Sequence, residues 1–278
     1  MEASDPAPLA NAAPVDDAAQ RFGGVARLYG RGALARLAAA HVCVIGLGGV
    51  GSWTVEALAR SGIGALTLVD LDDLCVTNVN RQIHALEGTI GRPKAEVLAE
   101  RVRLIHPGCR VEARVEFFAD SSADRILGAA RFDYVVDAID SLKNKLLAIV
   151  RCRAEALPIV TVGGAGGRSD PTQVRIDDLA FSERDPLLRY VRKRLRERHG
   201  FSRDVTEQWG VPCVYSMEYP VYPHRDGTTG SRPEADADAA INCTTGVGTA
   251  SFVTGAFGFA AASVVVRALA NAAATGSG

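Results

Sequence analysis

The stretch VCVIGLGGVGS, residues 42–52, decides the fold that this sequence predicts. Its first half is a short apolar, β-branched run, which is typical of a buried strand. The run continues into Gly46, Gly48 and Gly51, which match the pattern G-x-G-x-x-G at the start of a helix. Glycine permits the tight turn and lets phosphate oxygens approach main-chain N–H groups. The stretch therefore predicts a strand, a phosphate-binding turn and a helix, although glycine turns also close ordinary βα units.

A second strand is predicted in LTLVDLDD, residues 66–73. It ends at Asp70, 19 residues after Gly51, where a carboxylate can accept hydrogen bonds from ribose hydroxyls. This spacing favours a nucleotide site but does not choose between NAD and ATP.

The basic residues that follow favour ATP. Attack of a carboxylate on the α-phosphate of ATP builds negative charge that must be neutralised, whereas hydride transfer has little use for cations at the phosphates. Arg81 and Lys94 are the candidates for that task. Further polar side chains of the same region are Asp72, Asn78, Asn80 and Gln82.

A metal ligand is expected after a third buried strand, residues 132–139. Asp140, with Asp137 nearby, follows this strand at its carboxyl end. Because Mg²⁺ prefers hard oxygen ligands, these carboxylates could hold it there.

The composition agrees with one compact enzyme domain. A chain of 278 residues with 47% hydrophobic residues can bury a large core and is not disordered as a whole. The net charge of −1 implies that any contact with nucleic acid is local. The six cysteines form no C-x-x-C pair, which argues against a structural zinc, and no signal peptide is present, so we expect the cytoplasm.

Strand and helix patterns alternate along the chain after a leader at residues 1–20, which is rich in Ala, Pro and Asp and expected to be disordered. The alternation predicts an α/β fold: a Rossmann-like, doubly wound, mostly parallel sheet in a single domain over residues 21–278. We expect helices at about 51–61, 93–106, 123–130 and 142–156, and strands at about 110–117 and 158–162. A C-terminal insertion over 163–245 follows, with short strands near 174–176 and 214–222 and a polar, mobile loop at 224–240, and then a final apolar helix over 246–270.

One helix of the insertion is strongly basic. Within ten residues it carries six cations opposed by Glu197: Arg189, Arg192, Lys193, Arg194, Arg196 and Arg198. Such density attracts phosphates, although a solvated helix face with salt bridges is the ordinary explanation. Tyr190 and Phe201 are candidates for stacking on an unpaired base.

The uncharged apolar run at residues 246–266 is long enough to span a membrane. It is dominated by small residues, so its drive into lipid is modest. We therefore expect a buried or interface helix and no membrane association.

The motifs G-x-G-G-V-G-S, D-x-D-D, N-x-N-R-Q, the following lysine and D-A-I-D-S together resemble the adenylation domain shared by ubiquitin-activating enzymes and their bacterial relatives in molybdopterin and thiamine biosynthesis. Within that superfamily, four segments resemble the tRNA threonylcarbamoyladenosine dehydratases, which cyclise a modified adenosine beside the anticodon. These segments are residues 21–30, 75–86, 160–173 and 185–196. The resemblance runs over nearly the whole chain.

The resemblance implies that ATP and its metal are bound by Gly48, Asp70, Asp72, Arg81, Gln82, Lys94 and Asp140. It also implies a homodimer, and it allows a sulfur-relay partner of the cysteine desulfurase type. Relatives of the molybdopterin type insert an arginine from the partner subunit within an R-Y-x-R-Q motif. Here Gly24 stands at the place of the second arginine, so Arg21 or Arg27 would have to substitute.

The function that we expect is ATP-dependent cyclisation of threonylcarbamoyladenosine in tRNA through activation of its threonyl carboxylate, with Arg81, Lys94 and Asp140 in catalytic roles. The remaining nucleotide contacts would come from Gly46, Gly48, Gly49, Gly51, Ser52, Asp70, Asp72, Asn78, Asn80, Gln82, Asp137 and Ser141. Two alternatives stay open: activation of the C-terminus of a ubiquitin-like sulfur carrier, and an NAD-binding or scaffolding Rossmann protein. The sequence does not decide between AMP and phosphate as the leaving group.

A covalent thiol intermediate is not expected. Cys213 or Cys243 could in principle accept the acyl group. Cyclisation needs no thiol, because the activated carboxyl and the attacking ureido group belong to one side chain.

Overall fold

The computed structural model describes residues 18–233 and 247–272. Its central sheet has seven strands in the order β3-β2-β1-β4-β5-β7-β6. Neighbouring strands pair in parallel, except that β6 runs antiparallel to β7. The strands are β1 (His41–Ile45), β2 (Ala65–Val69), β3 (Arg110–Arg114), β4 (Tyr134–Asp137), β5 (Ile159–Val162), β6 (Val174–Asp178) and β7 (Pro212–Ser216). A separate hairpin joins β8 (Tyr222–Pro223) to β9 (Thr229–Gly230).

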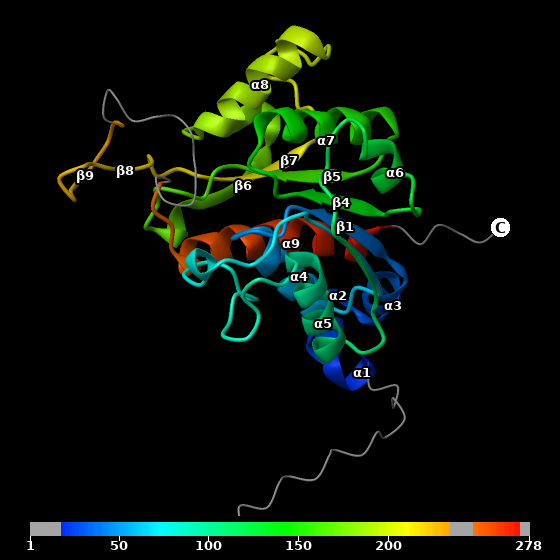
Figure 1. Cartoon of the computed structure of the whole chain (residues 1–278). Coiled ribbons are helices and arrows are strands. Elements are labelled where there is room, and N and C mark those ends of the chain that lie inside the picture. Colours follow the sequence, from blue (N-terminus) through cyan, green and yellow to red (C-terminus); the bar gives the residue numbers. More distant parts are fainter. Residues whose placement is uncertain (1–17, 234–246, 273–278) are drawn as a thin grey trace, which may run out of the picture.

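Helices cover both faces of the sheet (Figure 1). One face carries α3 (Arg31–Ala39), α4 (Gly51–Arg60), α5 (Lys94–Ile105) and α9 (Ser251–Asn271), with α1 (Ala18–Arg21) and α2 (Gly23–Tyr29) beside them. The other face carries α6 (Ala123–Leu127), α7 (Leu142–Ala154) and α8 (Pro186–Arg198). Short 3₁₀ turns are η1 (Val76–Asn78), η2 (Pro171–Gln173) and η3 (Leu179–Phe181).

Strand β1 shows why this sequence forms a doubly covered sheet. Successive side chains of a strand point to opposite faces. Val42 and Val44 pack into the core that contains α4 and α9, whereas Cys43 and Ile45 pack into the core under α6, α7 and α8. Because both faces are buried, the strand is a continuous apolar run. The predicted Rossmann-like, mostly parallel sheet is confirmed.

The predicted helices are present, and those expected at 51–61, 93–106, 123–130 and 142–156 end one to three residues earlier than predicted. The predicted continuous strand at 214–222 is wrong, because β7 ends at Ser216 and β8 begins only at Tyr222. The main chain leaves the sheet there, since Pro220 has no N–H and the Glu218 carboxylate accepts hydrogen bonds from the main-chain N–H groups of Ser169 and Asp170. Residues 18–20 of the expected leader belong to helix α1, whereas residues 1–17, like part of the expected mobile loop, lie outside the described residues.

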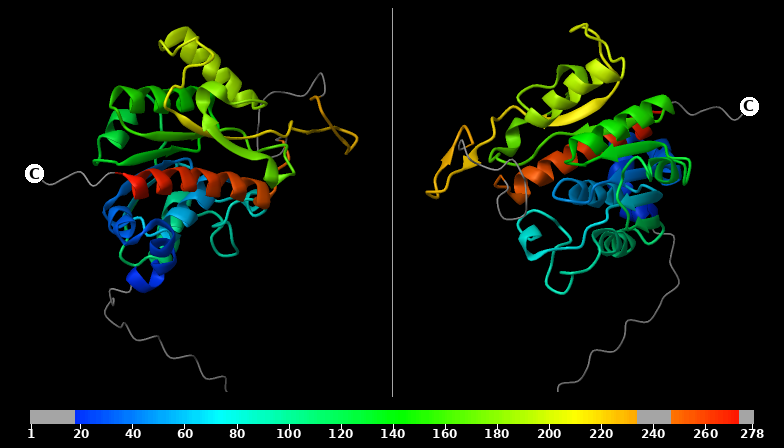
Figure 2. Two further views of the ribbon diagram at one scale, coloured as in Figure 1. Left: turned by 180° about the vertical axis from the view of Figure 1, so that it is seen from behind. Right: turned by 45° about the horizontal axis from the view of Figure 1, so that its top comes forward.

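The final apolar segment forms a core helix. By length and composition α9 could cross a membrane, with a hydropathy of 1.7, but 56% of its most apolar window is buried. Figures 1 and 2 show it lying along the face of the sheet opposite to α7 and α8. A Cβ on Gly258 would come within 2.7 Å of the Val50 carbonyl oxygen in the turn before α4, so a glycine is required for this close approach. Residues 246–250 of the predicted helix are not helical or lie outside the described residues.

Candidate active site

The carboxyl ends of β1, β2 and β4 meet at one edge of the sheet. The Gly46 N–H donates to the Val69 carbonyl at 2.9 Å, and the Ala138 N–H donates to the Ile45 carbonyl at 2.9 Å. Gly46 has a φ of +88°, and a Cβ there would lie 2.8 Å from the Ala138 carbonyl oxygen. The glycine turn after β1 is therefore held against the turn after β4, in the crevice where doubly wound folds bind ligands.

Gly51 and Gly48 of this turn have different surroundings. A Cβ on Gly51 would lie 1.8 Å from the Gly46 carbonyl oxygen, so the first turn of α4 can close onto β1 only with glycine there. A Cβ on Gly48 would meet only the Gln82 Nε2, at 4.0 Å. The space above Gly48 is therefore open, and the packing of the turn does not require glycine at this position.

Substituting these glycines separates the two roles. We expect Gly51→Ala to lower the free energy of unfolding by about 3 kcal/mol or more, because main-chain atoms must move apart. Gly48→Ala should leave the free energy of unfolding within about 1 kcal/mol and raise the Kd for ATP roughly tenfold, because its methyl group fills ligand space. Urea unfolding and calorimetric ATP titration measure the two effects. Equal loss of stability in both variants would contradict this division of roles.

Asp70 and Lys94 lie beside the turn. The Asp70 Oδ2 accepts a hydrogen bond from the Leu47 N–H at 2.6 Å, and its Oδ1 accepts one from the Asp72 N–H at 2.9 Å. Burial raises the pKa of Asp70, although the nearby Lys94 charge opposes this. Lys94 is nearly buried, and its Nζ lies 2.7 Å from the Asp72 Oδ2. Each Asp70 oxygen keeps a second lone pair with which to accept a ribose hydroxyl.

Arg81 and Gln82 lie next to the glycine turn, beside Gly49 and Gly48. The aliphatic part of Arg81 lies 3.4 Å from where a Gly49 Cβ would be, and its guanidinium donates to the Thr77 carbonyl at 2.7 Å. The Gln82 Oε1 is buried and has no hydrogen-bond partner among the described residues. Its amide is therefore placed beside Gly48 with an acceptor still to be satisfied.

Three contacts hold the Arg81 loop in place. The Arg81 carbonyl accepts hydrogen bonds from the Trp53 Nε1 at 3.0 Å and from the Thr254 hydroxyl at 3.3 Å. The Asn80 amide donates to the Thr249 carbonyl at 3.0 Å. Contacts with α4 and α9 therefore hold the segment that carries Arg81, and no pattern in the sequence indicates this role of Trp53 or Thr254.

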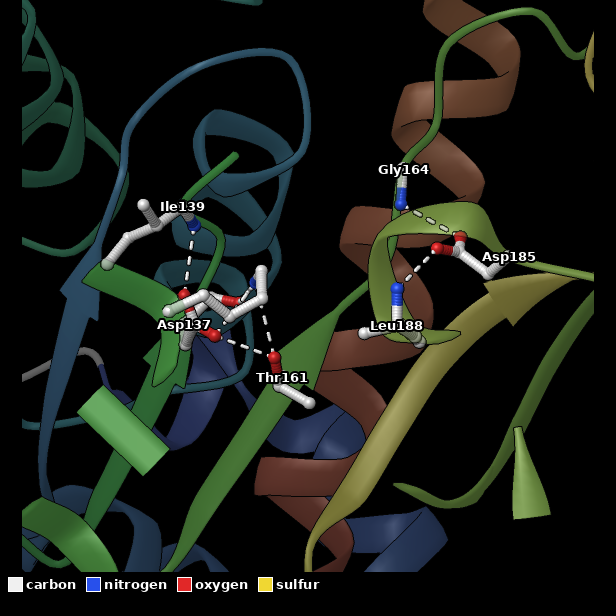
Figure 3. Close-up of polar contacts among 7 residues, drawn as sticks. Asp137, Ile139, Thr161, Gly164, Asp185 and Leu188 are labelled. Carbon is white, nitrogen blue, oxygen red and sulfur yellow. Dashed lines mark hydrogen bonds and ion pairs between the residues drawn. The ribbon is translucent and has the colours of Figure 1, made fainter. Parts of the chain in front are cut away.

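Asp137 is not presented to a ligand, contrary to expectation. It is the last residue of β4, its side chain points inward, and it is fully buried. Its Oδ2 lies 2.8 Å from the Lys145 Nζ and accepts a hydrogen bond from the Thr161 hydroxyl at 2.6 Å (Figure 3). Its Oδ1 accepts the Ile139 N–H at 3.1 Å, so Asp137 shapes the turn that leads to the exposed Asp140.

Lys145, the buried partner of Asp137, is a residue that no motif of the sequence indicates. It is fully buried on α7, which is rare for lysine unless it is paired. The only available signal was its place eight residues after Asp137, which cannot be distinguished from an exposed helix position without the structure.

Of the other residues expected to contact the nucleotide, some are buried in the fold and some are partly exposed beside the glycine turn. Ser52 is buried with an unpartnered hydroxyl among the described residues, and the buried Asn78 accepts the Cys75 N–H at 3.1 Å and so shapes η1. Ser141 is the partly exposed residue before α7. In the described ranges no group of three or more His, Cys, Asp or Glu is arranged to hold a metal ion. A cation at Asp140 would therefore take most of its ligands from phosphates and water.

His84 is buried next to the site and is kept neutral. Neither ring nitrogen has a hydrogen-bond partner among the described residues. Burial, with smaller contributions from the charges of Lys94 and Arg101, lowers the pKa of His84 from 6.5 to about 3.

This pKa predicts a loss of stability in acid. Between pH 6.5 and about 3 the unfolded chain binds a proton at His84 that the folded chain does not, so stability falls as the pH falls through this window. From about pH 7 to about pH 5 the loss is about 2 kcal/mol. We expect His84→Leu to remove this part of the pH dependence in urea unfolding at the two pH values. Identical pH dependence in the two proteins would show that His84 is protonated when folded.

The thiol of Cys213 is not available for acyl transfer. It is fully buried on β7, and burial raises its pKa. Cys243 lies outside the described residues.

The basic helix α8 lies on the opposite face of the sheet from α9. Leu188, Val191 and Leu195 bury one side of the helix. The other side forms a shallow groove with the following loop, lined by Arg189, Arg192, Lys193, Arg196, Glu197 and Arg203.

The six cations of α8 are not equivalent. Arg192 donates to the Ser182 hydroxyl at 2.6 Å and Arg196 to the Ser202 carbonyl at 3.3 Å, so both also support the fold. Lys193 and Arg194 lie 3.9 and 3.2 Å from the Glu197 carboxylate. Arg189, Lys193 and Arg198 are the most exposed of the set and therefore the best placed for phosphates.

One of the two expected stacking residues is excluded. Phe201 is 3% exposed and packs edge-on against Trp209, with ring centroids 4.9 Å apart. Tyr190 is 50% exposed, and the Arg189 guanidinium lies 5.3 Å from the centre of its ring. Tyr190 remains the candidate for contact with a base.

Neither N-terminal arginine reaches the site of its own chain. The Arg21 guanidinium donates to the Ile105 carbonyl at 3.4 Å, at the end of α5 opposite to Lys94. Arg27 is exposed on α2. Either residue could serve a nucleotide site only from a second subunit.

Comparison with known proteins gives consistent results. A family model described as the ThiF family matches residues 23–276. The chain is 49% identical, over 249 residues, to the tRNA threonylcarbamoyladenosine dehydratase of Escherichia coli (strain K12), with 89% of this chain and 92% of that protein covered.

Two solved structures are similar over the same length. The crystal structure of the E. coli tRNA N6-threonylcarbamoyladenosine dehydratase in complex with ATP has a TM-score of 0.82 and 46% identity, covering 94% of this chain and 99% of the other. The complex with AMP has a TM-score of 0.80 and 46% identity, covering 92% and 96%.

Proposed function

This chain belongs to the ThiF family, and on that premise we propose that it is an ATP-dependent dehydratase that cyclises threonylcarbamoyladenosine in tRNA. The observation that carries the proposal is the arrangement at the sheet edge. An open glycine turn lies beside a carboxylate for ribose, Asp70, and beside two cations, Arg81 and Lys94. A dehydrogenase would not need these cations at its phosphates.

We place ATP with its phosphates over residues 46–52 and its ribose at Asp70. Main-chain N–H groups at the start of α4 favour negative charge there. The Gln82 Nε2, which lies 4.0 Å from the Cβ position of Gly48, is a donor suited to phosphate oxygens and supports the same placement.

The reaction proceeds in two steps in this proposal. The threonyl carboxylate oxygen attacks the α-phosphorus of ATP, and pyrophosphate leaves with the bonding electron pair. The ureido group of the same side chain then attacks the activated carbonyl carbon, loses a proton, and expels AMP, which carries away the carboxylate oxygen. The nucleoside loses one water overall. The AMP complex of the E. coli relative supports adenylation over transfer of the terminal phosphate.

The chain's own residues have distinct tasks. Lys94, held by Asp72, and Arg81, held by Thr77, supply fixed positive charge where the transition state gains negative charge. Ring closure needs no enzyme nucleophile, since both reacting groups are on one side chain. The buried Cys213 is consistent with this.

Asp140 would hold Mg²⁺ that arrives with ATP. The exposed carboxylate at the end of β4 is the type of oxygen donor that this ion prefers. Bound there, Mg²⁺ would neutralise phosphate charge.

The RNA partner and the assembly are parts of the same proposal. We place tRNA phosphates on the exposed face of α8 and a base beside Tyr190. We propose a homodimer in which Arg21 or Arg27 enters the partner's site, because neither reaches its own. We also propose a cytoplasmic location, and a cysteine desulfurase system is a partner that the family resemblance allows.

Mass spectrometry of tRNA nucleosides tests the function. After incubation with this protein, ATP and Mg²⁺, threonylcarbamoyladenosine should be replaced by a nucleoside that lacks one water, with one AMP formed per event. Unchanged tRNA, together with ATP cleavage that depends on a ubiquitin-like sulfur carrier, would overturn the proposal in favour of sulfur-carrier activation. Binding of NAD in place of ATP would favour a plain Rossmann protein.

A further inference from the structure

Two segments that carry the dehydratase resemblance, residues 160–173 and 185–196, are joined in the fold by one buried ion pair. The first contains β5 and a loop with four glycines, residues 163–167, and the second is helix α8 with its preceding residue. Arg168 from the loop and Asp185 before the helix meet with Nη2 and Oδ2 3.4 Å apart, and the side chains are only 2% and 0% exposed.

The loop after β5 folds around its own arginine. The Arg168 guanidinium donates to the Gly164 carbonyl and, at 3.0 Å, to the Gly166 carbonyl. Gly167 has a φ of +73°, and a Cβ there would lie 2.7 Å from the Val221 carbonyl oxygen. Glycine at position 167 therefore lets this loop pack closely against the main chain at Val221.

Asp185 ties this loop to the first turn of α8. Its Oδ1 accepts the Leu188 N–H at 2.9 Å and so caps the helix, while its Oδ2 accepts the Gly164 N–H at 2.9 Å (Figure 3). A Cβ on Gly163 would lie 2.3 Å from the Asp185 Oδ2, so the contact also requires glycine at the end of β5. One carboxylate thus joins the carboxyl end of a central strand to the basic helix.

Strand β5 lies next to β4, one of the strands whose carboxyl ends form the expected ATP site. β5 pairs with β4, and the Thr161 hydroxyl of β5 donates to Asp137, which shapes the turn leading to Asp140. Figure 3 shows two separate groups of polar contacts, one around Asp137 and Thr161 and one around Asp185, and the main chain from Thr161 of β5 to Gly164 links the two.

Stability alone is a weak reason for such a pair. Burying two charges costs solvation free energy, and apolar replacements of similar size are often as stable. Holding the loop after β5 and the first turn of α8 in a fixed relative position is a role that accounts for a buried pair bonded to both segments.

We propose that Arg168 and Asp185 are positioning residues that fix α8 relative to the nucleotide edge, so that tRNA bound on α8 presents its modified nucleoside to the activated phosphate. This inference rests on the proposed function. Neither residue contacts the substrate in it; both act through the placement of α8.

The test compares Arg168→Met with Arg168→Lys and the wild-type chain. We expect Arg168→Met to raise the KM for tRNA about tenfold and to lower kcat, because RNA still binds but is held in the wrong place. The Kd for ATP with Mg²⁺ should change less than about twofold, because no contact of Arg168 reaches the glycine turn of β1. Arg168→Lys should recover most of the loss by restoring the charge.

Hydrogen exchange distinguishes positioning from general destabilisation. In Arg168→Met, exchange should speed up in residues 163–170 and 184–192 and stay unchanged in residues 46–52 and 70–82. The double variant Arg168→Met, Asp185→Asn leaves no unpaired buried charge and should show the same pattern if the single variant fails to fold.

The matched control is Arg101→Met, which removes an arginine from the buried Glu56 carboxylate between α4 and α5. It should lower thermal stability without changing the KM for tRNA. Exchange that rises throughout the chain, or a KM equal to that of the control, would overturn the positioning role. If the wild-type chain does not modify tRNA at all, the proposed function fails while the exchange pattern still reports whether the pair holds α8.

Discussion

Turnover should fall about 10²- to 10³-fold when Lys94 or Arg81 is replaced by alanine, since each supplies preorganised positive charge to the transition state. Lys94 is buried beside the glycine turn, and its partner Asp72 is 69% exposed, so the variant leaves Asp72 in water and not as a buried unpaired charge. The fold should therefore survive. The rate of AMP formation with saturating modified tRNA measures the effect, and tRNA binding should stay within about twofold of the wild type.

Arg92→Ala is the matched control. Arg92 lies two residues before Lys94, and its side chain, which is 41% exposed, forms an ion pair with the exposed Glu100. Its loss should change neither turnover nor ATP binding, because exposed ion pairs contribute little. Full activity of Lys94→Ala and Arg81→Ala would remove the adenylation mechanism, and an equal loss in Arg92→Ala would show that net charge near the site is responsible.

The parts of the site that sequence could predict are those fixed by local geometry. The glycine turn, Asp70 and Lys94 lie where their spacing in a βαβ unit requires, because the carboxyl ends of parallel strands must share one edge. The alternating burial of β1 follows from period-two geometry in the same way.

The parts that sequence could not predict depend on which way a side chain points. Asp137 and Asp140 are three residues apart, and only the structure shows that the first is buried against Lys145 and the second exposed. Phe201 was a reasonable candidate for stacking, but packing against Trp209 buries it. An ion pair between residues from two separate segments, such as Arg168 and Asp185, is not indicated by any periodic pattern in the sequence.

Binding of tRNA on α8, as we propose it, would let a chain with a net charge of −1 engage an RNA through one helix. The apolar side of α8 is buried, so the basic side faces outward, and Asp185 accepts the N–H groups of both Leu188 in the helix and Gly164 after β5. A small basic area with a defined position then suffices, because long-range attraction over the whole surface is not needed to hold one loop of RNA.

Removing the three most exposed cations of this helix should weaken tRNA binding about 100-fold at about 0.1 M salt, because each phosphate contact contributes about −0.7 to −0.9 to the slope of log affinity against log salt. The variant is Arg189→Ala, Lys193→Ala, Arg198→Ala, which leaves the fold-supporting Arg192 and Arg196 in place. The slope should become less steep by about 2. Titration of labelled tRNA at several salt concentrations measures both quantities, and the Kd for ATP should not change.

The control for this variant must remove as much charge elsewhere. Arg103, Arg110 and Arg131 are exposed and lie near the amino ends of β3 and β4, at the edge of the sheet opposite to the nucleotide turn. Their triple replacement by alanine changes the net charge by the same amount, so a general field effect would weaken tRNA binding equally in both variants. A large loss confined to the α8 variant would place the RNA on this helix, whereas an equal loss, or none in either, would mean that tRNA binds another surface and that α8 is only a solvated helix face.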